Sequence, residues 1–211
     1  MNTRALLLAL PLLALAACRD NRASIQMQAI CLPPKTCLFT GKCEAQYIGF
    51  VSIDAAVSER LWIFMQVENQ LPDNTNVETG KLNTNDAHAD EVSVEYDGIA
   101  LPRAVYELPN YSMPAGTTSV ISIDVIPTAL NAGLRLAAYA PTPSPRDMVA
   151  NVTLRGYYDD GSRFETGAFA VGVRVCSGCL SAAPCAANTC PPSTAGILPL
   201  TCMDPAGAGT T

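Results

Sequence analysis

The chain has 211 residues, a formal net charge of −6, 49% hydrophobic residues and 15% charged residues. A hydrophobic content of this size supports a packed core and argues against a disordered tether. An acidic chain with few basic clusters is a poor partner for DNA, RNA or anionic lipid surfaces, so we expect no nucleic acid partner.

The first part of the chain has the layout of an export signal. Arg4 is followed by an apolar run from Ala5 to Ala17 that contains no polar residue. The run is shorter than the roughly 20 residues that a helix needs to span a bilayer, and Pro11 interrupts it. A charged start, a short apolar stretch and small residues at its end predict a signal peptide over residues 1–17.

The sequence Leu15-Ala16-Ala17-Cys18 closes this apolar run and resembles the lipobox of bacterial lipoproteins. In that family a dedicated peptidase cuts before the cysteine, which then carries a diacylglycerol and usually an amide-linked chain. The resemblance implies lipidation of Cys18 and stable attachment, because two or more acyl chains hold a protein on a bilayer. Arg19, where the family's retention signal has Asp, favours the outer membrane. The alternative is ordinary signal cleavage beside an unmodified Cys18.

Eight of the nine cysteines remain once Cys18 is set aside: Cys31, Cys37, Cys43, Cys176, Cys179, Cys185, Cys190 and Cys202. Exported thiols meet an oxidising compartment, so we predict disulfides. Three of them precede the central part of the chain and five follow it. Complete internal pairing therefore needs at least one bridge between the two sets, and we expect a late cysteine such as Cys190 or Cys202 to make it.

We divide the rest of the chain into three parts. Residues 18–43 are expected to hold the lipid anchor, a polar spacer to about Ala29 and a cysteine-containing loop. Residues 44–175 contain no cysteine and have the usual length of one domain. Residues 176–211 are rich in Cys, Pro, Ala and Gly, and predict a cysteine-rich tail with a disordered end.

Apolar and polar residues alternate with period two through the middle part, at Glu91–Asp97, Ile121–Val125, Asn151–Arg155 and Phe169–Val175. This alternation predicts half-buried antiparallel strands. Leu61–Val67 is apolar on both faces, as in a central strand, while Tyr47–Ile53 and Ala104–Leu108 are weaker strand candidates. Asp160-Gly161 predicts a hairpin turn, and Ala129–Tyr139 is a candidate short helical crossover.

About seven short strands without a long helix resemble the immunoglobulin or fibronectin-III type of domain. The expected fold class is therefore all-β, with a two-sheet antiparallel sandwich. The absence of cysteines from 44–175 removes the Cys–Trp–Cys spacing of a true immunoglobulin domain.

Two cysteine motifs have alternative chemical interpretations. Cys176-Ser-Gly-Cys179 has the spacing of a redox dithiol, but no helix is predicted after it to lower a thiol pKa. The spacing from Cys176 through Cys185 to Cys190 imitates a four-thiolate zinc site, which an oxidising compartment disfavours. We expect structural disulfides here, with no metal and no cofactor.

Candidate catalytic groups are few. His88 is the only histidine, and its polar surroundings predict an exposed loop residue rather than a general base. The loop acids Asp159-Asp160 and Asp86/Asp90/Glu91 are candidates for Ca²⁺ binding or a carboxylate pair. Tyr106, Tyr111, Tyr157 and Tyr158 predict either a binding patch or core packing.

These patterns favour a lipid-anchored, non-catalytic binding or structural module of the bacterial cell envelope, with an envelope protein as a possible partner. The alternative is an envelope hydrolase that uses carboxylates in the loops between strands.

Overall fold

The computed structural model describes residues 24–31, 42–43, 46–47, 50–55, 60–130, 132–134 and 145–176. Cys18, the signal segment and the cysteines at 37, 179, 185, 190 and 202 lie outside these residues, as does most of the predicted helical crossover. Its described part contains the 3-10 turn η1 (Thr128–Leu130) and a helical turn at 132–134. Within the described ranges, no helix is long and apolar enough to cross a membrane.

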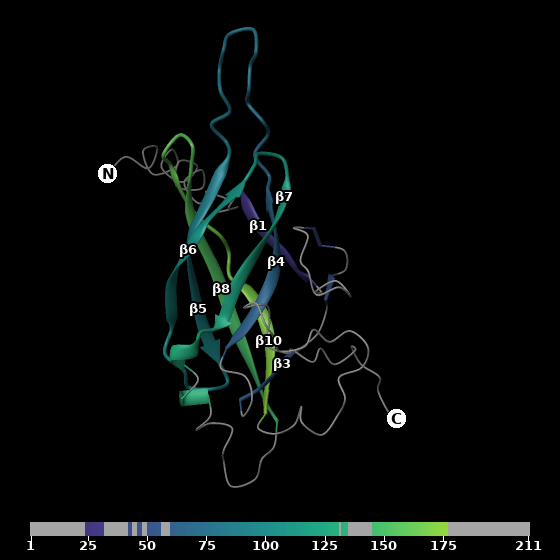
Figure 1. Ribbon diagram of the computed structural model, residues 1–211, viewed down its shortest axis with the longest axis vertical. Helices are drawn as coiled ribbons and strands as arrows, with labels where there is room; N and C mark the ends of the chain where they lie inside the picture. Colours follow the sequence, from purple (N-terminus) through teal and green to yellow (C-terminus); the bar gives the residue numbers. More distant parts are fainter. Residues whose placement is uncertain are drawn as a thin grey trace, which may run out of the picture.

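In the described part of the chain, ten strands form two sheets (Figure 1), which confirms the prediction of a mainly β structure with two sheets. The smaller sheet contains β1 (Ile25–Cys31), β2 (Gln46–Tyr47), β4 (Leu61–Asn69) and β7 (Thr118–Ile126), in the order β2-β1-β4-β7. The larger contains β3 (Val51–Asp54), β5 (Ala87–Asp97), β6 (Ala104–Met113), β8 (Arg146–Tyr158) and β10 (Phe169–Cys176), in the order β3-β10-β8-β5-β6. It is curled, and β9 (Arg163–Glu165) pairs with β8.

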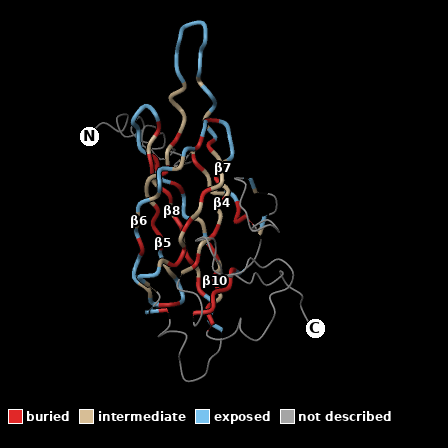
Figure 2. The backbone as a smooth tube through the Cα atoms, in the orientation of Figure 1, coloured by how far each residue is buried: buried red, intermediate tan, exposed pale blue. Residues whose placement is uncertain are grey.

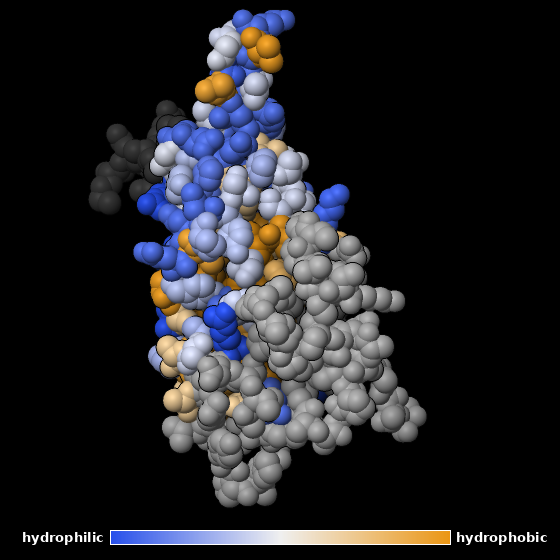
Figure 3. Space-filling view, viewed as in Figure 1, coloured by the Kyte–Doolittle hydropathy of each residue, from blue (hydrophilic) through white to orange (hydrophobic). Residues whose placement is uncertain are grey.

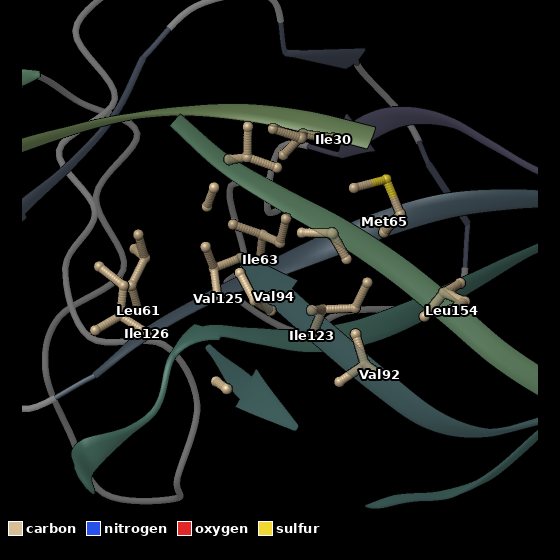
Figure 4. Close-up of a cluster of buried hydrophobic side chains, with 14 of the residues drawn as sticks. Ile30, Leu61, Ile63, Met65, Val92, Val94, Ile123, Val125, Ile126 and Leu154 are labelled. Carbon is tan, nitrogen blue, oxygen red and sulfur yellow. The ribbon is translucent and has the colours of Figure 1, made fainter. Parts of the chain in front are cut away.

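The predicted alternation is confirmed in β8, where Val152 and Leu154 are buried and their neighbours are half-buried. β4, for which the sequence predicted apolar residues on both faces, alternates in burial as well. In β4, Leu61, Ile63, Met65 and Val67 are at most 2% exposed, while the residues between them are half-buried. Side chains of both sheets meet in one hydrophobic cluster (Figure 4), to which β5 contributes Val92 and β8 contributes Leu154. Figure 2 shows the buried residues running along the strands.

Two tyrosines of the larger sheet bond to the edge of β7 in the smaller one. The Tyr96 hydroxyl donates to the Val125 carbonyl at 2.7 Å, and the Tyr106 hydroxyl donates to the Asp124 carbonyl at 2.8 Å. Burial of both phenols, together with the nearby Asp124 charge, raises the pKa of each hydroxyl. These phenols therefore act as neutral hydrogen-bond donors that tie the two sheets together.

The structure corrects the expected polar spacer. Ile25–Cys31 forms β1, which pairs with β4, and Ile25 and Ile30 are buried in the core. The alternation in the sequence is short, because it covers only Ile25 to Ala29 before an irregularity between Met27 and Ala29 shifts the register and Ile30 is buried next to Ala29. Cys31, at the end of β1, forms a disulfide with Cys43, with Cα atoms 5.2 Å apart.

The expectation of a wholly antiparallel arrangement is wrong at one pair. β3 runs parallel to β10, with Val51 opposite Val173 and Ile53 opposite Val175. The predicted strand Tyr47–Ile53 is in fact two: β2 belongs to the smaller sheet and β3 to the larger. All four β3 residues are buried, which is the pattern of a strand covered on both faces.

Candidate interaction surface at the loop end

Three connections lie at one end of the two sheets, which we call the loop end: residues 70–86 between β4 and β5, 114–117 between β6 and β7, and 159–162 between β8 and β9. Hydrogen bonds to Asp86 hold the three connections together. Asp159 N–H donates to the Asp86 carbonyl at 3.0 Å. The Asp86 carboxylate also accepts from Ala115 N–H at 2.8 Å. Asp86 therefore joins all three connections.

The β4–β5 connection, residues 70–86, projects from the loop end as a narrow hairpin (Figure 1), and we call it the arm. Near its tip, Asn76 and Lys81 pair in antiparallel fashion through two backbone hydrogen bonds of 3.0 and 2.9 Å. Gly80 has a φ of +66°, a conformation that glycine adopts without steric cost, and this closes the turn. The arm is therefore a hydrogen-bonded hairpin, whereas the sequence had indicated a flexible polar loop.

Asparagine side chains hold the base of the arm. The Asn74 side chain accepts from Thr84 N–H at 2.9 Å and donates to the Thr84 hydroxyl at 2.9 Å, so it joins the two sides of the hairpin. The Asn85 amide donates to the Pro72 carbonyl at 2.7 Å. Asn amides bond readily to nearby backbone groups, and at the base of the arm they link the two sides below the backbone pairing of Asn76 and Lys81.

Asn69, the last residue of β4, anchors this network in the core. It is fully buried, and its amide donates to the Asn85 carbonyl at 2.8 Å and to the Met113 carbonyl at 3.0 Å. Its side-chain oxygen accepts from Leu71 N–H at 3.1 Å. One buried amide therefore connects the start of the arm, its end and the end of β6.

Apolar side chains lie at the far end of the arm. Val77 is 90% exposed and Leu82 is 79% exposed, and Figure 3 shows apolar groups near the end of the arm among hydrophilic ones. Glu78 and Lys81 supply one charge of each sign beside them. The tip thus presents two exposed apolar side chains beside one pair of opposite charges, although the chain as a whole is acidic.

The structure corrects the placement of His88, which lies on β5 rather than in a loop. Its Nε2 is 2.8 Å from Oδ1 of Asp159, and its ring stacks on Tyr157 with centroids 5.1 Å apart. The prediction failed because β5 begins with Ala87 and Ala89, whose small buried side chains give little alternation signal. Gly156 allows β8 to pair with β5 beside His88, since a Cβ added at Gly156 would overlap the His88 carbonyl oxygen.

The predicted carboxylate sites are each engaged by a different donor. Asp90 pairs with Arg163 at 3.0 Å, and Glu91 pairs with Arg155 at 2.8 Å. The hydroxyl and N–H of Ser162 bond to Asp160, which lowers the pKa of that carboxyl. Among the residues that the structure describes, no group of three or more His, Cys, Asp or Glu side chains is placed to hold a metal ion.

The predicted tyrosine cluster divides into two groups. Tyr158 is buried, and Tyr106 and Tyr111 pack against the core. Tyr157 instead stacks on His88 at the surface, and its hydroxyl is 3.4 Å from Oδ1 of Asn110. Core packing therefore accounts for three of these four residues.

Cys176 ends β10 and is disulfide-bonded, with its partner beyond the described residues. A bonded Cys176 fits the structural interpretation of the Cys176–Cys179 region better than the redox or zinc one. Since Cys31 pairs with Cys43, complete pairing would make Cys37 the cysteine that joins the C-terminal set.

Comparisons of the chain with protein-family models, curated proteins and solved structures give no match.

Proposed function

We propose that this chain is a lipid-anchored, non-catalytic binding or structural module of the bacterial cell envelope, held on the outer membrane through Cys18. The lipobox Leu15-Ala16-Ala17-Cys18 supports the anchor. The loop end, with the arm as its most prominent feature, would be the contact surface.

The strand order supports a sandwich of the immunoglobulin type. Variable-type immunoglobulin domains combine an A-B-E-D sheet with a sheet that contains G, F, C and C′. If β1, β4 and β7 are strands A, B and E, the larger sheet supplies G, F, C and C′ as β10, β8, β5 and β6. The chain departs from that family in two respects. β4 and β8 contain no cysteine for the disulfide between strands B and F, and no described strand pairs with β7 in the place of strand D.

The observation that carries the proposal is the arm. In this correspondence the arm is the B–C connection, and residues 159–168, with the turn at 159–162 and β9, are the F–G connection. Both connections belong to the binding end of variable domains. A hairpin held by a buried Asn69 and bearing exposed Val77 and Leu82 places apolar surface at a fixed position beyond the domain. Functional contacts are commonly made by such segments on a rigid scaffold.

The hydrolase alternative gains no support from these contacts. A carboxylate pair needs two acids facing one substrate position. Asp90 and Glu91 instead pair with separate arginines, and Asp159 bonds to His88.

Metabolic labelling with palmitate tests the anchor. We expect the label to be incorporated into the wild-type chain and lost in Cys18→Ser. Label that persists in Cys18→Ser would show that the predicted lipidation site is wrong.

Turnover assays on the purified mature protein test the non-catalytic assignment. We expect no hydrolytic or redox turnover, and therefore no difference between wild type, His88→Ala and Cys176→Ser at matched folding. Turnover that one of these substitutions abolishes would replace the binding module with an enzyme.

A further inference from the structure

We infer that the tip of the arm contacts the same lipid bilayer that holds Cys18, with Val77 and Leu82 entering its interfacial layer. This inference rests on the proposed lipid anchor, and it names the partner of the arm. The arm would then be a second contact that fixes how the domain stands on the membrane.

The first argument is the place where the chain joins the domain. Ser24 lies beside the base of the arm, because its carbonyl accepts from Gln70 N–H at 2.8 Å. The next residue, Ile25, pairs with Asn69 at the end of β4. Chain arriving from Cys18 therefore enters at the loop end, and a membrane anchor at Cys18 lies on the arm's side of the domain.

The second argument is reach. The six residue steps from Cys18 to Ser24 span at most about 20 Å. The seven steps from Gln70 to Val77 cover at most about 23 Å at the rise of a β-strand. Both segments start from the same pair of hydrogen-bonded residues and have similar maximum lengths, so one bilayer can meet the lipid on Cys18 and Val77 together when the two segments extend the same way.

The third argument is the chemistry of the tip. Val77 and Leu82 are the most exposed of the large apolar residues in the described part of the chain. Glu78 and Lys81 beside them balance in charge, which suits a zwitterionic interface better than an anionic one. The polar stem below, held by Asn74 and Thr84, suits the aqueous layer between membrane and domain.

The test uses the full lipidated chain in phosphatidylcholine vesicles whose acyl chains carry bromine, a quencher of indole fluorescence. Val77→Trp places an indole at the tip, and Val105→Trp places one on β6 at a site that is 53% exposed. We expect bromine to remove about half of the emission that Val77→Trp adds to the wild-type signal, since interfacial side chains lie about 5–10 Å deep. Emission added by Val105→Trp should not change.

An indole itself favours the interface, so a second measurement keeps the native Val77 and Leu82 side chains. A photo-crosslinker in place of Glu78 should form lipid adducts, and the pair Val77→Ser and Leu82→Ser should reduce them about tenfold through the lost apolar burial. Equal thermal unfolding of all variants shows that the fold is retained.

The outcomes separate the two proposals. Flotation of the lipidated chain with the vesicles, without quenching at Val77→Trp and without lipid adducts, overturns the bilayer contact and leaves the anchor standing. Adducts formed only with protein also overturn it. A chain that does not float overturns the anchor and this inference with it.

Discussion

The two-sheet core and the arm are both ordered, but different interactions order them. In the core, residues such as Ile63 and Leu154 are buried at every second position of β4 and β8. In the arm, a short backbone ladder at Asn76 and Lys81 and a set of asparagine amides hold a chain that buries little apolar surface. Hydrophobic alternation therefore reveals only the first kind of order.

Replacing a leucine by alanine in the core and in the arm should give the largest difference in unfolding free energy. Leu154→Ala should cost about 2–5 kcal/mol of unfolding free energy, because it leaves a cavity in a fully buried site. Leu82→Ala should change it by less than about 0.5 kcal/mol, since Leu82 is 79% exposed. Urea unfolding of both variants checks this, and equal costs would mean that the tip is packed against the domain.

Gly156 of β8 lies where β5 and β9 approach most closely, at His88 and Phe164. Gly156→Ala should cost about 2–3 kcal/mol, because the new methyl would overlap the His88 carbonyl and approach the Phe164 ring to 2.7 Å. Gly167→Ala is the matched control, since nothing lies within 4 Å of its added Cβ. Thermal unfolding compares the two, and a neutral Gly156→Ala would contradict the close approach.

The substitution Asn69→Ala tests whether the ordered structure of the arm depends on its attachment to the core. Asn69→Ala should cost about 1–3 kcal/mol, because it leaves the Asn85 and Met113 carbonyls without their buried donor. The arm should also become sensitive to limited proteolysis between residues 70 and 86. Asn76→Ala at the exposed tip should leave global stability nearly unchanged. An Asn69→Ala protein with a protease-resistant arm would show that the arm is held without the core.

The last expected effect is a pH dependence of stability from Asp124. Burial raises the pKa of this carboxyl to about 6, although a hydrogen bond from Trp62 and the charge of Arg60 oppose the rise. A raised pKa favours the protonated folded form, so the contribution to stability is lost as pH rises from about 4 to above 6. Relative to Asp124→Asn, wild type should therefore lose stability over this range. Urea unfolding at pH 4, 5.5 and 7 measures the difference, and parallel profiles would contradict it.

The sequence predicted the strands that alternate strongly, and the structure confirms β7, β8 and β10 on that basis. The turn at Asp160-Gly161 is also confirmed, with Gly161 at a φ of +81°. These features depend on local chemistry, namely which residues are apolar and which accept a positive φ. They can be predicted without knowing which strand lies beside which.

Features that depend on distant partners could not be predicted in the same way. The parallel pairing of β3 is set by where the chain crosses between sheets, and the place of β1 is set by its pairing with β4. His88 meets Asp159 only because β5 and β8 are neighbours. For the arm, the sequence offered one signal of an ordered hairpin. Four asparagines lie between residues 74 and 85, and asparagine side chains often bond to nearby backbone groups.

The measurement that tests the central claim most directly is amide hydrogen exchange of the full chain, residue by residue. If the arm is an ordered hairpin, the amides of Asn76, Lys81 and Thr84 should exchange well below the rate of an unstructured peptide. Each of these amides donates a hydrogen bond within the arm. Their protection should fall in Asn69→Ala while that of β8 persists. Exchange of these three amides at the unstructured rate in wild type would contradict the account, since the loop end would then have no fixed arm to present.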